Sequence, residues 1–258
     1  LGPDPLVPVP FSYPRVLSAA GGGTSCEERA CRGAVSRSRS AHFGKCSSTA
    51  ALESDPAPAL AGIAATPQGN IPMALTESTM VALGMPAPDF QLPDVVSGRT
   101  ISLKTFAGKK ALLVMFICRH CPYVQHVQEG LARLGRDYAA KDVGIVAISA
   151  NDAKGYPEDA PASLRAMAVE LKFSFPYCYD ESQAVAKAYS AVCTPDFFVF
   201  DQARRLVYRG QLDDSRPGNG KPVTGRDLRA ALDAVLDGRP VDSTQRPSVG
   251  CNIKWKRV

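Results

Sequence analysis

Residues 111–121 read ALLVMFICRHC, and this stretch decides the fold. The segment Ala111–Ile117 is entirely apolar and rich in branched side chains, which predicts a central strand buried on both faces. A helix is predicted over 122–141, because apolar residues recur at spacings of three and four, at Val124, Val127, Leu131 and Leu134. The dithiol sequence Cys118-Arg119-His120-Cys121 therefore falls where a strand passes into a helix.

Further strands and helices alternate on both sides of this joint. A second central strand is predicted over 143–149, and shorter strands over 90–92, 100–103, 176–179, 197–200 and 206–210. Helices are predicted over 163–171 with Ser163 as N-cap, over 182–189, and over 224–237 with Thr224 as N-cap. This order predicts an α/β protein, a thioredoxin-like three-layer α/β/α sandwich around a central mixed sheet.

Composition divides the chain into three parts. Residues 1–83 are rich in Pro, Gly, Ser and Arg, which predicts a disordered leader, either a transit peptide followed by a linker or a simple linker. Residues 84–240 form the predicted domain, and residues 241–258 a tail that packs on it, with Trp255 as the docking side chain. A transit peptide would place the protein in an organelle, with the plastid favoured over the mitochondrion; without one the protein would be cytoplasmic.

Charge and hydropathy exclude other classes of protein. The 258 residues include 30 basic and 25 acidic side chains, so the net charge of +5 is too mild for a strongly basic nucleic-acid binder. No apolar run approaches the ~18 residues of a membrane span. The eight cysteines are too sparse for a disulfide-stapled mini-domain, and Cys26, Cys31 and Cys46 fall in the leader.

The dithiol sequence has the features of a redox site. A helix N-terminus, the Arg119 guanidinium and a protonated His120 would each stabilise a thiolate at Cys118 and lower its pKa. Cys121 lies one turn further on, where it could resolve a mixed disulfide, and Pro122 is tolerated in the first helical turn. Two other interpretations stay open: a metal site formed by Cys118, Cys121 and His120, and two inert buried thiols.

A second motif is predicted to face the dithiol. Cys193-Thr194-Pro195 precedes the strand over 197–200, and we expect the Thr194-Pro195 bond to be cis, which would expose backbone groups to a peptide substrate. Cys193 and Cys251 are candidates for additional redox thiols, the latter if the tail folds back on the site. Cys178 is expected in the core.

Several stretches resemble the alkyl hydroperoxide reductase/thiol-specific antioxidant (AhpC/TSA, redoxin) branch of the thioredoxin superfamily. They span about residues 84–257 and are PAPDF (86–90), FICRHCPYVQH (116–126), ANDAKGYPEDAP (150–161), AVCTPDFFVFD (191–201), YRGQLDDSRPGNGKPVTGRDLRAAL (208–232) and PSVGCNIKWK (247–256). The resemblance implies that Cys118 attacks, Cys121 resolves and Pro195 is the cis-proline.

The chain departs from this pattern at functional positions. Peroxiredoxins carry Thr or Ser three residues before the attacking cysteine and Pro seven before, where this chain has Met115 and Ala111. Their peroxide-polarising Arg is also missing, which predicts weak peroxidase activity. The strand before the dithiol lacks the acid that thioredoxins use as a base, which leaves His120, Glu129 and Asp196 as candidates.

Together these features predict a thiol–disulfide oxidoreductase that contributes to thiol redox homeostasis. The alternatives are a thiol-dependent peroxidase and a non-enzymatic metal-binding thiol protein. No metal or organic cofactor is expected. Its partners would be protein disulfides or a thioredoxin-type electron donor, with no nucleic acid and no membrane, and the protein would be a monomer or weak dimer.

Overall fold

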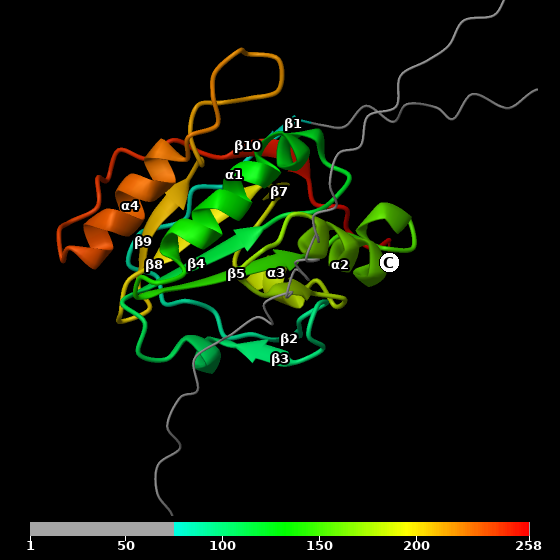
Figure 1. Ribbon diagram of the computed structural model, residues 1–258, viewed down its shortest axis with the longest axis horizontal. Coiled ribbons are helices and arrows are strands. Elements are labelled where there is room, and N and C mark those ends of the chain that lie inside the picture. The colour runs from blue at the N-terminus through cyan, green and yellow to red at the C-terminus, as the bar shows by residue number, and fades with distance from the viewer. Residues whose placement is uncertain (1–74, 258) are drawn as a thin grey trace, which may run out of the picture. The chain divides into compact units, whose positions relative to one another are not determined.

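A five-stranded mixed sheet lies at the centre of the computed structural model, which describes residues 75–257 (Figure 1). Its strand order is β6-β5-β4-β8-β9. The strands β4 (Ala111–Phe116), β5 (Val143–Ser149) and β6 (Tyr177–Tyr179) pair in parallel. On the other side of β4, β8 (Asp196–Phe200) pairs antiparallel with β4, and β9 (Leu206–Gly210) pairs antiparallel with β8. The predicted strand at 111–117 is confirmed as the central one, buried along its whole length.

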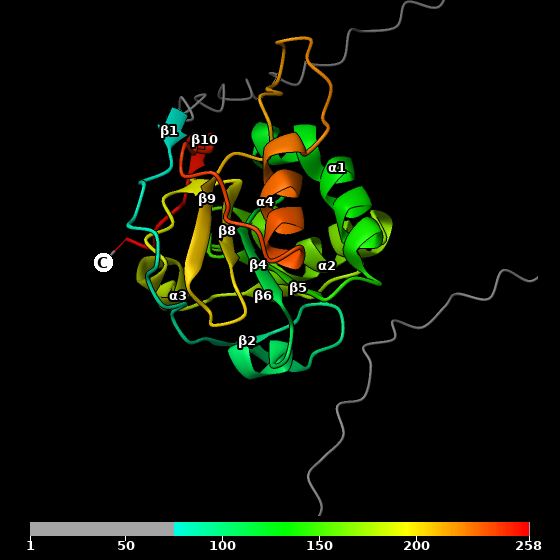
Figure 2. The same cartoon turned by 90° about the vertical axis from the view of Figure 1, so that its left-hand side faces the viewer.

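Both faces of the sheet are covered. Successive side chains of each strand point to opposite faces, so the fully apolar central strand contributes to an apolar layer on each face. Ala111, Leu113 and Met115 pack on the face covered by α1 (Pro122–Tyr138), α2 (Pro161–Glu170) and α4 (Arg226–Leu236). Leu112, Val114 and Phe116 pack on the other face, against α3 (Ala184–Ala188), the hairpin of β2 (Gln91–Pro93) and β3 (Thr100–Ser102), and the 3-10 turn η1 (Leu103–Phe106). Figure 2 shows α1 and α4 together, with α3 away from them. The thioredoxin-like α/β fold is confirmed.

A small second sheet joins the two ends of the described chain. It has the order β1-β10-β7, with β1 at Leu75–Glu77, β7 at Cys193–Thr194 and β10 at Val249–Asn252. The predicted boundary at residue 84 therefore differs from the structure, since β1 lies before it and pairs with β10. Composition missed this pairing because both strands are short and gain their partners only in the folded chain.

The C-terminal segment lies on the domain by means other than the predicted one. Ile253 is buried, whereas Trp255 is 39% exposed and lies beneath the Lys187 ammonium group. The expectation that Trp255 docks the tail is therefore wrong. The pairing of β10 and the burial of Ile253 hold the segment instead.

Helix starts also differ from two predicted caps. Ala160 rather than Ser163 is the N-cap of α2, since Pro161 and not Ser163 begins the helix. Gly225 is the N-cap of α4, although the Thr224 hydroxyl accepts a hydrogen bond from the Arg226 backbone N–H at 3.2 Å.

Within residues 75–257 no helix has the length and apolar character to cross a bilayer. The transit peptide and its organelle address fall outside the described residues and stay predictions.

Candidate active site

The dithiol occupies the loop between β4 and α1, as predicted. Cys118 follows the strand, Cys121 is the N-cap of α1, and Pro122 is its first residue. The helix N-terminus therefore adjoins Cys121 more closely than Cys118. Both cysteines are fully buried.

Thr194 contacts both sulfur atoms of the dithiol. Its side-chain oxygen Oγ1 lies 3.2 Å from Cys118 Sγ, and its carbonyl oxygen lies 3.2 Å from Cys121 Sγ. The bond between Thr194 and Pro195 is cis, which confirms that expectation. Cys193 precedes this pair, but its sulfur faces the Pro195 carbonyl oxygen at 3.8 Å. Burial raises the pKa of the Cys193 thiol, so this cysteine lies beside the dithiol as a buried neutral group.

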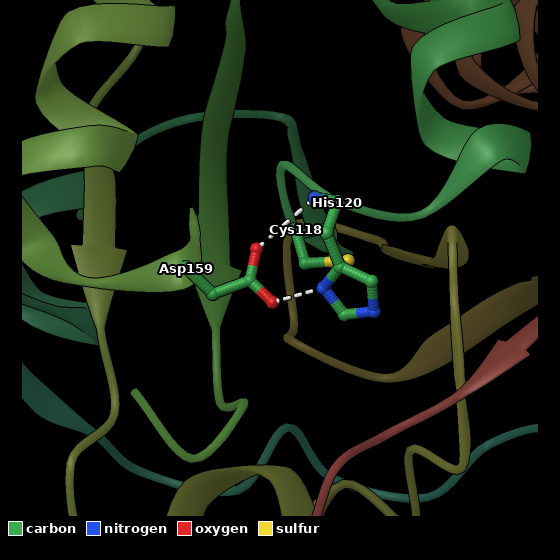
Figure 3. Close-up of side chains that lie close together, drawn as sticks. All are labelled: Cys118, His120 and Asp159. Atoms are coloured by element: carbon green, nitrogen blue, oxygen red, sulfur yellow. Dashed lines mark hydrogen bonds and ion pairs between the residues drawn. The ribbon is translucent and has the colours of Figure 1, made fainter. Parts of the chain in front are cut away.

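Asp159 is a site residue that the sequence did not single out (Figure 3). It is the last residue of the 3-10 turn η2 (Pro157–Asp159) and is fully buried. Its Oδ1 atom accepts hydrogen bonds from the backbone N–H groups of Arg119 at 2.7 Å and His120 at 3.2 Å. Its Oδ2 atom pairs with His120 Nδ1 and accepts from Asn151 Nδ2 at 2.7 Å. Asp159 thus holds the whole loop between the two cysteines.

The pKa of Asp159 reflects these contacts. Burial opposes ionisation, but the hydrogen bonds from His120 and Asn151 outweigh it and hold the pKa of the carboxyl below its ordinary value. The only signal in the sequence was an acid within the stretch 150–161 that carries the family resemblance. Its proximity to the dithiol depends on the packing of η2 against the β4–α1 loop.

The predicted thiolate at Cys118 is not favoured in the reduced protein. Burial raises the pKa of Cys118, the hydrogen bond to Cys121 and the Asp159 charge raise it further, and the Thr194 hydroxyl opposes them. The two basic side chains that should have lowered it have other partners. The Arg119 guanidinium donates to the Ser163 carbonyl oxygen at 2.6 Å, and His120 pairs with Asp159 while its ring stacks on Tyr156.

Cys121 is instead the preferred position for a negative charge. Hydrogen bonds from the thiols of Cys118 and Cys251, with a contribution from the Val124 backbone N–H, hold the pKa of Cys121 well below its ordinary value despite burial. Cys251, on β10, brings its sulfur to 2.7 Å from Cys121 Sγ. The structure therefore joins Cys118, Cys121 and Cys251 into one buried sulfur cluster.

The other suggested bases lie elsewhere or have a structural partner. Glu129 is exposed on α1, with Arg133 in the next turn. Asp196 is buried at the start of β8 and pairs with the equally buried Arg209 at 3.1 Å. Of the three candidate bases, His120 alone lies beside Cys118, and Asp159 holds its ring through Nδ1.

A metal ion would have incomplete ligands at this site. One ligand atom each from Cys118, His120 and Asp159 lie within 4.8 Å of one another. A structural zinc needs four ligands, and both Asp159 oxygens already accept hydrogen bonds, Oδ1 from the Arg119 backbone N–H and Oδ2 from Asn151 Nδ2. This arrangement fits a hydrogen-bonded acid–base group better than a preformed metal centre.

Comparisons with known proteins identify a family and two close relatives of known structure. Residues 83–209 match the AhpC/TSA family. An uncharacterized conserved protein from Geobacillus kaustophilus is 55% identical; the match covers 72% of this chain and 98% of that chain, with a TM-score of 0.71. A hypothetical protein from Sinorhizobium meliloti is 52% identical over 71% and 100% of the two chains, with a TM-score of 0.70. No curated protein gave a significant match. This chain belongs to the AhpC/TSA family.

Proposed function

We propose that the protein is a thiol–disulfide oxidoreductase whose redox pair is Cys118 and Cys121, and that it acts on protein disulfides or exchanges electrons with a thioredoxin-type donor in thiol redox homeostasis. The observation that carries this proposal is that Thr194, next to the cis-proline, lies 3.2 Å from both sulfur atoms. Both thiols thus meet where a substrate disulfide would lie against the Pro195 loop.

The hydrogen bond between the two cysteines supplies the first proton transfer. The Cys118 thiol donates to the Cys121 sulfur, because the pKa of Cys118 is raised by burial and the pKa of Cys121 is held below its ordinary value by this hydrogen bond. As Cys118 attacks a substrate disulfide, its proton passes to Cys121 and one substrate sulfur leaves as a thiolate. His120, oriented by Asp159, lies beside Cys118 and is placed to protonate that leaving group.

Resolution completes a two-electron transfer. Cys121 attacks Cys118 in the mixed disulfide, forms the Cys118–Cys121 disulfide and releases the second substrate sulfur, to which Cys121 passes the proton that it received from Cys118. The substrate gains two electrons and two protons, and the protein loses them.

Reduction of insulin disulfides with dithiothreitol tests this function. We expect Cys118→Ser to fall to the uncatalysed rate, because serine cannot form the mixed disulfide. Cys121→Ser should trap the mixed disulfide with insulin, which is visible on a non-reducing gel. Cys178→Ser is the matched control, since Cys178 is equally buried but lies in β6 on the other face of the sheet. Equal activity of Cys118→Ser and the wild type would refute the proposal.

A thiol-dependent peroxidase is the second candidate. Two observations favour it. Cys118 is buried, which suits a small oxidant. The Thr194 hydroxyl lies beside Cys118 and supplies the hydroxyl group that peroxiredoxins carry three residues before the attacking cysteine, where this chain has Met115. Hydrogen peroxide consumption with dithiothreitol as electron donor distinguishes the two activities. Peroxide consumption much faster than insulin reduction, and lost in both Cys118→Ser and Thr194→Val, would make the peroxidase the principal activity.

A further inference from the structure

A third cysteine, distant in sequence, lies against the redox pair. Cys251 Sγ is 2.7 Å from Cys121 Sγ, although the residues are separated by 130 positions. Both residues are buried, Cys251 being 2% exposed. Reacting atoms in near-attack arrangements lie about 3–3.5 Å apart, so the two sulfur atoms are within reach of each other without movement of the backbone.

The second sheet is built to bring Cys251 to this position. In the antiparallel pairing of β10 with β7, Cys251 lies opposite Thr194 and Asn252 opposite Cys193. Gly250 permits the close approach, because a Cβ atom there would lie 2.6 Å from the Thr194 carbonyl carbon. Thr194 therefore contacts the sulfur atoms of Cys118 and Cys121 and is the strand partner of Cys251.

We propose that Cys251 is a third redox cysteine, which takes over the disulfide from the Cys118–Cys121 pair. This inference rests on the proposed function. The Cys251 sulfur attacks Cys121 Sγ in the Cys118–Cys121 disulfide; the Cys121–Cys251 bond forms, and Cys118 leaves as the reduced sulfur. The proton of the Cys251 thiol ends on Cys118. One disulfide replaces another, so no further oxidant or reductant enters the step.

The charges around Cys251 change in the direction that this exchange needs. In the reduced protein the pKa of Cys251 is raised, first by its hydrogen bond to Cys121 and then by burial, and the Lys254 ammonium opposes this. Once Cys121 is part of a disulfide it carries no negative charge, so the largest cause of the raised pKa is removed. Oxidation of the pair thus activates the third cysteine.

The exchange has a consequence for function. It restores the attacking cysteine while the protein still holds one oxidised pair. A second substrate can then form a mixed disulfide with Cys118, or an electron donor can reduce the Cys121–Cys251 bond at the C-terminal strand.

Disulfide mapping of the full chain tests the exchange. The chain carries Cys26→Ser, Cys31→Ser and Cys46→Ser, so that only cysteines of residues 75–257 can react. The reduced protein is oxidised with one equivalent of diamide, quenched in acid, denatured and alkylated with N-ethylmaleimide. We expect Cys118 to be alkylated and a linked peptide to join Cys121 to Cys251. Alkylation of Cys251 together with a Cys118–Cys121 link would overturn the proposal.

Variants separate this inference from the proposed function. In Cys118→Ser the Cys121–Cys251 link should still form, while insulin reduction is lost; in Cys251→Ser the link should join Cys118 to Cys121. Cys178→Ser should leave the mapping of the parent chain unchanged. If insulin is reduced and Cys118 and Cys121 link, but Cys251 stays alkylated throughout, the exchange is wrong and the oxidoreductase stands. If neither link forms and insulin is not reduced, both proposals fail.

Discussion

At the scale of single residues, Thr194 makes a different contact with each cysteine of the pair. Its hydroxyl faces Cys118, whereas its carbonyl oxygen faces Cys121. A side-chain substitution therefore reaches one sulfur and leaves the backbone contact of the other. This asymmetry allows the role of the hydroxyl to be tested by itself.

Thr194→Val should slow the reaction of Cys118 about 3- to 10-fold, since a hydrogen bond of this kind contributes about 0.5–1.5 kcal/mol. The hydroxyl lowers the pKa of Cys118, so its loss leaves less thiolate. The measurement is the rate of insulin reduction, followed across the pH range. Thr194→Ser, which keeps a hydroxyl, should react like the wild type; an unchanged rate in Thr194→Val would contradict the assignment.

The Asp159 carboxylate holds the loop between Cys118 and Cys121 through hydrogen bonds that its negative charge strengthens. Its folded-state pKa lies below the ordinary 3.8, so the ionised carboxylate stabilises the folded protein at all pH values above about 3.8. This contribution is lost as the pH falls through the lowered folded-state value, where the carboxylate takes up a proton.

Asp159→Asn should lower the free energy of unfolding by about 2–4 kcal/mol at pH 7, because the hydrogen bonds to a charged group are weakened. The difference from the wild type should shrink as the pH falls below about 3.8 and through the lowered folded-state pKa, where the wild-type carboxylate is also protonated. Urea denaturation at pH 7 and pH 3 measures both values. Glu158→Gln, an exposed neighbour, should show neither effect. A pH-independent difference would show that charge is not the cause.

At the scale of elements, the contact of β10 with β7 depends on a missing side chain. Gly250→Ala would place a methyl group against the Thr194 carbonyl. The backbones at positions 250 and 194 belong to the paired strands β10 and β7, so neither can shift without disturbing that pairing. We expect a loss of about 2–4 kcal/mol in unfolding free energy, as for overpacked or strained sites. The Cys121–Cys251 link should also be lost in the diamide experiment.

Gly155→Ala is the matched control for this substitution. Its Cβ would lie 3.4 Å from the Asp152 side chain, which is ordinary contact in a polar loop. Its unfolding free energy should stay within about 0.5 kcal/mol of the wild type. Equal midpoints of urea unfolding for both glycine variants would mean that β10 does not need the close approach.

The elements that the sequence predicted most directly have an apolar pattern of their own. β4 and β5 are nearly continuous apolar runs that are buried on both faces, and α1 has apolar residues at spacings of three and four. β1 and β10 have no such pattern, since LTE is exposed and VGCN is short. Backbone pairing with distant partners, rather than local preference, makes them strands.

At the scale of the whole molecule, the C-terminal segment is part of the domain. Ile253→Ala should cost about 2–4 kcal/mol, as for a fully buried aliphatic side chain. Trp255→Ala should cost less than about 1 kcal/mol, because the ring is partly exposed and its described contact is a cation–π pair with Lys187. Thermal or urea unfolding measures both, and a larger loss for Trp255→Ala would restore the tail-docking role to the tryptophan.

The sequence by itself determined three features: the dithiol between a strand and a helix, the alternation of strands and helices, and the position of Thr194-Pro195 before a strand. Each follows from residues that are close together in the chain. Only the tertiary structure decided what surrounds the sulfur atoms. Asp159 and Cys251 approach from distant segments, and the Asp159 carboxylate pairs with the histidine expected to support a Cys118 thiolate. Hydrogen bonds and charge interactions act over a few ångströms, so the ionisation of a thiol depends on its neighbours in space.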